Sequence, residues 1–423
     1  MFERPPTERQ WVSWLWVVLV ALAIYVTIPF ARAISQVVTD RWGREIFRDV
    51  VLGAIVAGSC VALLLLWRCR HRIGRQNVFW IIFVGLLYFH FTMSLKASPE
   101  ESLHFIEYGI LGVMLFRALS HRTRDPGVYV VAVLLGSLAG TMDEVIQWLT
   151  PHRVFDYRDV GFNAISGVLA QTAIWKGFTP PFIVRPIRPS TVQRICAVAA
   201  LNVMLLGACL MNTPRWTDRL VRIIPRLEHV RHKSSAMTEY GYKHVIPSMG
   251  VFHSRFTLGD LMWLDRKMGK DAARKLDRLY DPRRYGEFLS TYSPVTDPFL
   301  HEARVHLFRR DHYYAVAPKY EGDPELFPLH HTVAYRENQF MEAYFPVMMS
   351  HSRNRYSESR VEALKRNMNR RMVYESEVSS ELITMFTVWH VRWMLLAALV
   401  VLGAVDAYSR WWEKKKGGSS GAS

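Results

Sequence analysis

Eight long apolar runs constrain this chain more than any other feature of its 423 residues. Each run has almost no charge, and about 20 such residues are needed to cross the roughly 30 Å hydrocarbon core of a bilayer. The first run is longer than a signal-peptide core and has no small-residue cleavage site, so we expect it to be an anchor. The sequence therefore predicts an all-α, polytopic membrane protein. The predicted spans are residues 11–31, 50–67, 78–95, 103–118, 128–149, 159–175, 194–211 and 387–408.

The basic residues lie beside these spans, which sets the expected topology. The net charge of +16 would suit a nucleic-acid-binding protein, but Lys and Arg are concentrated in short loops, and such loops stay in the cytoplasm. The basic segments are 68–75, 117–124, 176–194 and 410–416. We therefore expect a bacterial cytoplasmic (inner) membrane protein with both termini inside, residues 212–386 periplasmic or extracellular, and no nucleic-acid partner. Loop 33–48 is the exception, because it places Arg41, Arg44 and Arg48 outside.

The spans divide the chain into segments with different expected roles. These are a two-helix membrane segment (1–77), a membrane core (78–176), a seventh span with its preceding loop (177–211), an extracytoplasmic domain (212–386), a last span with a basic tail (387–416) and a linker-like tail (417–423). The tail GGSSGAS has the composition of an added tag, and we expect no part of the fold from it. The outer domain is predicted to be mainly helical, with helices that open at Thr257, Asp297 and Ser357.

Histidines and aromatic residues are concentrated in the outer domain. Ten of the sixteen histidines lie there, but His301 and His306 do not share a helix face well, and adjacent His330 and His331 point apart. Histidines at the surface or at an interface are therefore the favoured interpretation, with a metal site as the alternative. The aromatic, Met-rich segment 335–349 is expected to form the core of the domain, and an exposed surface for a partner protein is the alternative.

Acidic and polar side chains fall at the outer ends of three neighbouring spans. At 1.5 Å per residue, Asp143 lies roughly 22 Å along its span and about 8 Å below the outer surface of the hydrocarbon core. Glu107 lies roughly 6 Å down by the same rule, and Asn163 lies at a similar depth. Unpaired carboxylates are costly there, so we expect these groups to face one another, Arg153 or a water-filled cavity.

Helical spacing predicts that these side chains form one polar layer. Within each span they recur at intervals of three or four residues, which places them on one helix face. The functional interpretation is a pocket that opens outward, and the alternative is a hydrogen-bonded lock that only joins the three helices. The members of the predicted polar layer are Glu101, His104, Glu107, Tyr108, Asp143, Glu144, Gln147, Arg153, Asp159 and Asn163.

The motifs that carry this layer resemble the VanZ-like family. They are PEESLHFIEYGILG (99–112), GTMDEVIQWLTPHR (140–153) and RDVGFNAISGVLA (158–170), in which Phe105, Leu111 and Gly167 are further matching positions. The resemblance covers about residues 78–176 and leaves the first two spans, the seventh span, the outer domain and the last span as additions. It implies a bacterial cell-envelope protein of a family associated with resistance to teicoplanin-type glycopeptide antibiotics. It implies no particular reaction.

Three functions are compatible with these features. The first is the binding of a lipid head group or a lipid-linked envelope precursor in the polar layer. The second is a structural or assembly subunit of a larger membrane complex with membrane or periplasmic partner proteins. The third is a membrane-embedded hydrolase or transferase, with His104 as general base and Glu107 or Asp143 orienting it or binding a metal.

Catalysis is the least supported of the three functions. The polar layer has no Ser or Cys nucleophile, and the chain has no HExxH motif and no phosphate-binding glycine loop. No cofactor is expected. A divalent ion bound by Asp143, Glu144 and Glu107 is the alternative, because carboxylates on neighbouring helices suit hard cations.

Overall fold

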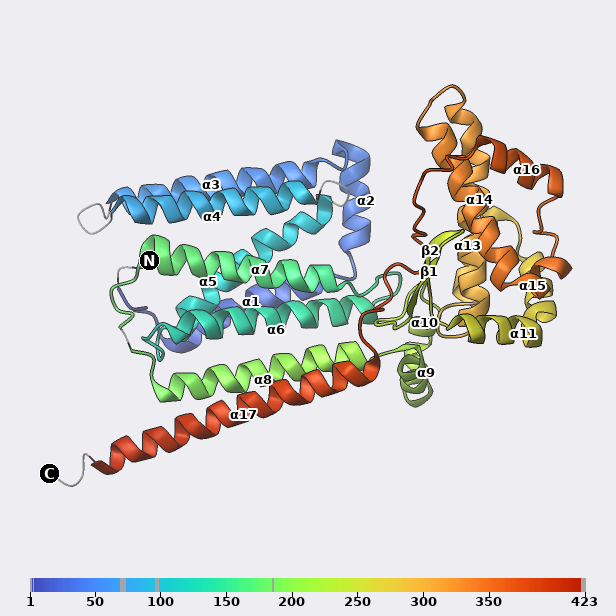
Figure 1. Cartoon of the computed structure of the whole chain (residues 1–423). Coiled ribbons are helices and arrows are strands. Elements are labelled where there is room, and N and C mark those ends of the chain that lie inside the picture. The colour runs from blue at the N-terminus through green and yellow to red at the C-terminus, as the bar shows by residue number, and fades with distance from the viewer. Residues whose placement is uncertain (1, 3, 69–73, 96–98, 185, 420–423) are drawn as a thin grey trace. The chain divides into compact units, whose positions relative to one another are not determined.

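The computed structural model describes residues 2, 4–68, 74–95, 99–184 and 186–419 (Figure 1). Its residues form two compact units, which we call the membrane unit (1–208 with 393–423) and the inserted unit (209–392). Most of the expected basic loop 68–75 lies outside the described residues, as do 420–423 of the expected tag. Residues 417–419 continue the last helix.

Apart from the short helix α2 (Ala31–Trp42), which runs across the others, the helices of the membrane unit lie side by side as a bundle (Figure 1). Its helices are α1 (Gln10–Thr27), α2 (Ala31–Trp42), α3 (Ile46–Arg68), α4 (Arg75–Ser94), η1 (Pro99–Ser102), α5 (Leu103–Leu119), α6 (Gly127–Leu149), α7 (Tyr157–Thr172), the π-helix η2 (Ala173–Phe178), α8 (Pro189–Met211) and α17 (Val388–Ser419). Seven of the described helices are long and apolar enough to cross a membrane, so the prediction of a helical polytopic membrane protein is confirmed.

The predicted sixth span, 159–175, differs from the other spans. It forms α7, which has 16 residues, and the six-residue π-helix η2 continues it. α7 alone is therefore shorter than the helices that can cross a bilayer by length. Helix α2 was not predicted, because its polar sequence ARAISQVVTDRW contains no long apolar run.

Small and polar residues let α5 pack closely against α7. The Cβ that an alanine at Gly112 would carry lies 3.2 Å from Cβ of Ala170, so the two backbones approach closely. Gln171 donates a hydrogen bond to the Gly112 carbonyl at 2.8 Å, and Ser166 donates one to the Phe105 carbonyl at 2.9 Å. Interhelical hydrogen bonds of this kind hold helices together where no hydrophobic driving force exists between them.

Helix α1 completes the support of these helices. Its apolar face packs with α5 and α6 in a cluster formed by Val17, Ile24, Tyr108, Leu111, Leu115, Ala118 and Ala132. The Tyr25 hydroxyl donates a hydrogen bond to the Ala139 carbonyl of α6 at 3.0 Å. Helix α1 therefore supports two of the three helices that carry the polar layer, α5 and α6.

The inserted unit is mainly helical, as predicted, but also contains an unpredicted hairpin. Its elements are α9 (Pro214–Ile223), η3 (Pro225–Leu227), α10 (Glu228–Arg231), β1 (Tyr242–Ile246), β2 (Gly250–Ser254), α11 (Leu258–Arg278), η4 (Pro282–Arg284), α12 (Tyr285–Thr291), α13 (Pro298–Val316), η5 (Ala317–Tyr320), α14 (Leu326–Tyr344), α15 (Pro346–His351) and α16 (Glu358–Asn367). The strands are antiparallel, and Gly250 adopts φ +119°, which favours glycine. The predicted caps Thr257, Asp297 and Ser357 each accept a backbone N–H at the start of α11, α13 and α16.

The core of the inserted unit includes segment 335–349, as expected from the sequence. Phe340, Phe345 and Met348 are buried together with residues of α11 and α13, so segment 335–349 forms core and the partner-surface alternative is wrong for these side chains. The expectation of surface histidines is also wrong at four positions. His301, His306, His330 and His331 are all buried.

Candidate functional site

The ten residues of the predicted polar layer divide into an inner group and a rim. The inner group is buried: Tyr108, Asp143, Glu144, Gln147, Asp159 and Asn163. The rim is half-buried: Glu101, His104, Glu107 and Arg153. The first part of α5, the last turns of α6 and the first part of α7 supply nearly all of these side chains, and the three helices pack against one another.

His104 and Asp143 meet between α5 and α6. Nδ1 of His104 lies 3.9 Å from Oδ2 of Asp143 and 3.4 Å from Oε2 of Glu107, one turn along α5. The Tyr108 hydroxyl donates a hydrogen bond to Oδ2 of Asp143 at 3.0 Å. The structure therefore joins four of the predicted residues in one constellation.

Glu144 is held by donors from α6 and from the chain that leads into α7. Nε2 of Gln147 donates a hydrogen bond to Oε1 of Glu144 at 2.7 Å, and the Asp156 backbone N–H donates one to Oε2 at 3.0 Å. Arg153, expected as a counter-charge, donates a hydrogen bond to Oε1 of Gln147. Gln147 therefore connects the guanidinium of Arg153 to the carboxylate of Glu144.

Several buried polar atoms of the described layer have no hydrogen-bond partner. They are Oε2 of Glu101, Nδ1 of His104, Oδ1 of Asp143, Oδ1 of Asp159, and both Oδ1 and Nδ2 of Asn163. Asp143 is 1% exposed and Asn163 is 0% exposed, so bulk solvent does not reach these groups in this arrangement. Buried polar atoms without a partner are uncommon, and each one requires an explanation.

Asn163 lies against α6 one turn before Asp143. A Cβ placed on Gly140 would come within 2.7 Å of Cβ of Asn163, so the absence of a side chain at Gly140 makes room for the amide. Asp159, one turn before Asn163 on α7, interacts electrostatically with His104 and Glu144. All three helices thus contribute polar groups to the same place.

Three residues of the layer present donor atoms suited to a metal ion. His104, Asp143 and Glu144 each offer one atom, and these atoms lie within 4.8 Å of one another. The sequence favoured Glu107 as the partner of the Asp143–Glu144 pair, whereas the structure places His104 in this group. The set is one imidazole nitrogen and two carboxylate oxygens.

Two residues that sequence reasoning missed also lie at the candidate site. Tyr25 of α1 lies within electrostatic range of Asp143, but nothing in the local sequence of α1 indicates which helix it packs against. Gly140 could have been predicted from the sequence, because it precedes Asp143 by three residues and so shares its helix face.

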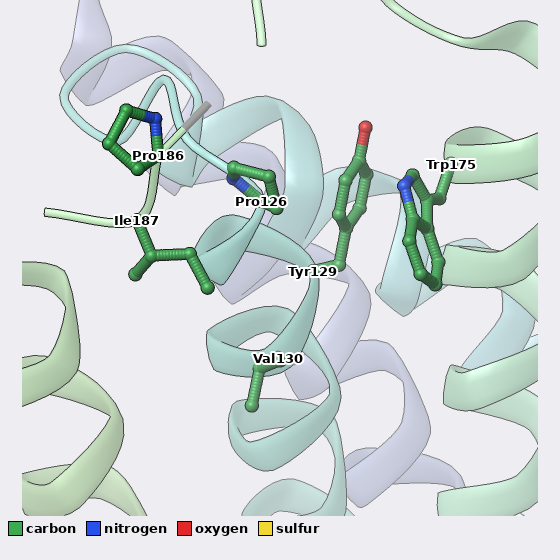
Figure 2. A pocket seen from close by; sticks show the side chains of 6 residues that line it. All are labelled: Pro126, Tyr129, Val130, Trp175, Pro186 and Ile187. Atoms are coloured by element: carbon green, nitrogen blue, oxygen red, sulfur yellow. The ribbon is translucent and has the colours of Figure 1, made fainter. Parts of the chain in front are cut away.

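An apolar cavity lies elsewhere in the membrane unit (Figure 2). Its volume is about 430 Å³, and its lining comes from Pro126, Tyr129, Val130, Trp175, Pro186 and Ile187. Asp143 lies about 21 Å further along α6 than Tyr129, since each helical residue adds 1.5 Å. This cavity is therefore not part of the polar layer.

Comparison with known proteins gives one match. Residues 14–178 match the VanZ/LLP1 family model. The match begins in α1, so the first two spans belong to the matched region and are not additions to it. No curated protein and no solved structure matches the chain.

Proposed function

Because residues 14–178 are a VanZ-like region within a multi-pass membrane protein, we propose that the polar layer binds the polar head group of a lipid or of a lipid-linked envelope precursor. The observation that carries the proposal is the carboxylate of Asp143. It is 1% exposed, and its Oδ1 atom has no hydrogen-bond partner. A ligand that reaches this atom would remove the cost of leaving it unpaired.

A lock between helices explains these atoms less well than a ligand site. In a lock, each buried donor or acceptor finds a partner within the bundle, because an unsatisfied group in hydrocarbon costs free energy. Glu144 fits that pattern, since both of its oxygens accept a hydrogen bond. Asp143 and Asn163 do not, although both lie where three helices meet.

The partly exposed rim residues give a head group access to the buried carboxylates. His104 and Glu107 have side-chain exposures of 15% and 33%, so they connect the buried carboxylates to the surface of the unit. Head groups of membrane lipids and lipid-linked precursors carry phosphate together with hydroxyl or amine groups. Arg153 at the rim suits a phosphate oxygen, and the carboxylates suit an amine or a bound cation.

The expected topology places this site in the outer leaflet. The polar layer lies at the ends of α5, α6 and α7 that are opposite to the basic segments 117–124 and 176–194, and such segments stay in the cytoplasm. On this topology residues 212–386 form an extracytoplasmic domain in the bacterial envelope. A lipid would then enter the site from the membrane and not from the cytosol.

Native mass spectrometry of gently solubilised full-length protein tests the proposal. We expect a bound lipid on the wild type, and its loss from Asp143→Asn and from Glu107→Gln. Asp125→Asn is the matched control, because Asp125 is also buried but lies before the opposite end of α6, where it accepts hydrogen bonds from Gly127 N–H and the Thr191 hydroxyl. Equal lipid retention by all four proteins would refute the site. Stoichiometric protein partners without such a lipid would favour the subunit function instead.

A further inference from the structure

We infer that His104, Asp143 and Glu144 bind one divalent metal ion, for which Zn²⁺ is the best-fitting probe. The inference deepens the proposed function, since it names how the same site would hold the phosphate of a head group. One imidazole and two carboxylates are ligands that Zn²⁺ accepts, and sites with three protein ligands keep a position open.

The distances suit an ion after small movements of side chains. The three donor atoms lie within 4.8 Å of one another. Bonds to Zn²⁺ of about 2.0–2.2 Å place tetrahedral donor atoms about 3.4 Å apart. Rotamer changes of about 1–1.5 Å would therefore close the three donors around an ion, without movement of the helices.

The net charge of the three ligands and the unpartnered oxygen of Asp143 are a second reason to infer a metal ion. Two carboxylates and a neutral imidazole carry two negative charges, which a divalent ion balances. Oδ1 of Asp143 has neither a donor nor solvent, and Asp143 is 1% exposed. A cation at this point would give the oxygen a partner in a place where an isolated charge is costly.

The neighbouring residues are arranged as supports of metal ligands. Tyr108 donates a hydrogen bond to Oδ2 of Asp143, and Gln147 and the Asp156 backbone donate hydrogen bonds to Glu144. Nδ1 of His104 has no hydrogen-bond partner, and it lies 3.9 Å from Oδ2 of Asp143 and 3.4 Å from Oε2 of Glu107, so this nitrogen faces the carboxylates. Asp143 and Glu144 therefore have orienting partners, as metal-ligating carboxylates do.

The open coordination position determines what the ion would do. An acidic layer by itself repels the phosphate of a head group. A divalent ion on three protein ligands leaves room for a phosphate oxygen as a further ligand. The metal would thus convert a site that attracts cations into one that holds an anionic head group.

Metal content of the full-length protein is the first test. After equilibration with chelator-buffered Zn²⁺, wild-type protein should retain about one ion per chain by elemental mass spectrometry, the stoichiometry of a site with three protein ligands. Asp143→Asn and Glu144→Gln should lose this ion, whereas the Asp125→Asn control should keep it. Substoichiometric Zn²⁺ on the wild type, or equal Zn²⁺ on all variants, would overturn the inference.

Two further measurements keep the test decisive if a ligand variant folds poorly. Zn²⁺ should raise the unfolding temperature of the wild type, because binding to the folded state stabilises it. Tyr108→Phe keeps all three ligands and should weaken Zn²⁺ binding by about 10–100-fold, as loss of a supporting hydrogen bond does. An unchanged unfolding temperature with Zn²⁺, or an unchanged affinity in Tyr108→Phe, counts against the metal site.

Lipid binding in the presence of a chelator separates the two proposals. If the chelator and Asp143→Asn both release the lipid, the metal-mediated site is supported. A lipid that Asp143→Asn releases but the chelator does not leaves the proposed function standing and refutes the metal. A lipid that neither releases refutes both.

Discussion

Glu337 in the inserted unit and Asp143 in the membrane unit are both buried carboxylates, but their surroundings differ. Glu337 is 0% exposed, and its Oε1 accepts hydrogen bonds from the Tyr374 and Ser376 hydroxyls at 2.5 and 2.6 Å. Its Oε2 pairs with Nδ1 of His306 at 2.5 Å. Asp143 has a hydrogen bond from Tyr108 on one oxygen and none on the other.

The difference separates a structural role from the proposed ligand site. Every oxygen of Glu337 has partners within the chain, so this residue joins α13, α14 and the segment that follows α16. One oxygen of Asp143 has no such partner among the described residues, although two other helices pack beside it. Burial of a charge alone therefore does not indicate function, whereas a buried carboxylate oxygen without a partner requires a further explanation.

The largest effect on stability is expected when Glu337, whose two oxygens both have partners, is removed. Glu337→Ala leaves His306, Tyr374 and Ser376 without their acceptor and should destabilise the inserted unit by about 3–5 kcal/mol, as the loss of one partner of a buried pair does. The control is Glu342→Ala on the same helix, whose ion pair with Arg355 is partly exposed and should be worth less than about 1 kcal/mol. Pulse proteolysis of the full-length protein in urea measures both, and equal losses would contradict the comparison.

Acid should also lower the stability of the inserted unit. Burial, with help from the charge of Arg255, lowers the pKa of His301 from 6.5 to about 3. Between pH 6.5 and 3 the unfolded chain therefore binds a proton at His301 that the folded chain excludes. The free energy of unfolding, at its full value above pH 6.5, should fall over this range by at most about 1.4 kcal/mol per pH unit. Burial opposes ionisation of Glu337, but His306 and the hydroxyls of Ser376 and Tyr374 outweigh it and hold its pKa below 4.5, which adds a second loss below that pH.

The variant His301→Gln isolates the first of these contributions. Urea unfolding between pH 7 and 4.5 should show a flatter pH dependence for His301→Gln than for the wild type. An identical slope in the two proteins would show that another group is responsible.

A smaller effect is expected from filling the space beside Asn163. Gly140→Ala would place a Cβ 2.7 Å from Cβ of Asn163, which forces α6 and α7 apart and should cost about 1–3 kcal/mol as overpacking does. It should also release the bound lipid. Gly167→Ala is the matched control, because a Cβ there meets nothing within 4 Å. Thermal unfolding and native mass spectrometry report the two effects, and equal behaviour of both variants would show that Gly140 does not shape the site.

The fold was predictable where the sequence carries a strong local pattern. Long apolar runs predicted the spans, and Thr257, Asp297 and Ser357 predicted three helix starts. The hairpin at 242–254 was missed because its strands have five residues each, too few for a clear alternation. The buried histidines were missed because a polar residue shows no sign of its partner, such as Glu337 for His306, until distant segments meet.

The proximity of the polar-layer residues was predictable from the sequence, but their individual contacts were not. Spacing along α5, α6 and α7 placed His104 and Asp143 on inward faces, and the structure brings them together. Spacing could not show that Gln147 connects Arg153 to Glu144, because that contact depends on the path of the chain after α6. Nor could it show that Tyr25 approaches Asp143, since α1 lies far from α6 in sequence.

The most direct test of the central claim measures stability and lipid binding together in Asp143→Asn, for which the smallest change in stability is expected. A ligand site predicts that this variant, free of ligand, unfolds at the wild-type temperature or slightly above it, because a buried charge with an unpaired oxygen is removed. It also predicts that the bound lipid is lost. A lock between helices predicts the reverse, namely a clear fall in unfolding temperature with lipid binding unchanged, and that result would contradict the claim.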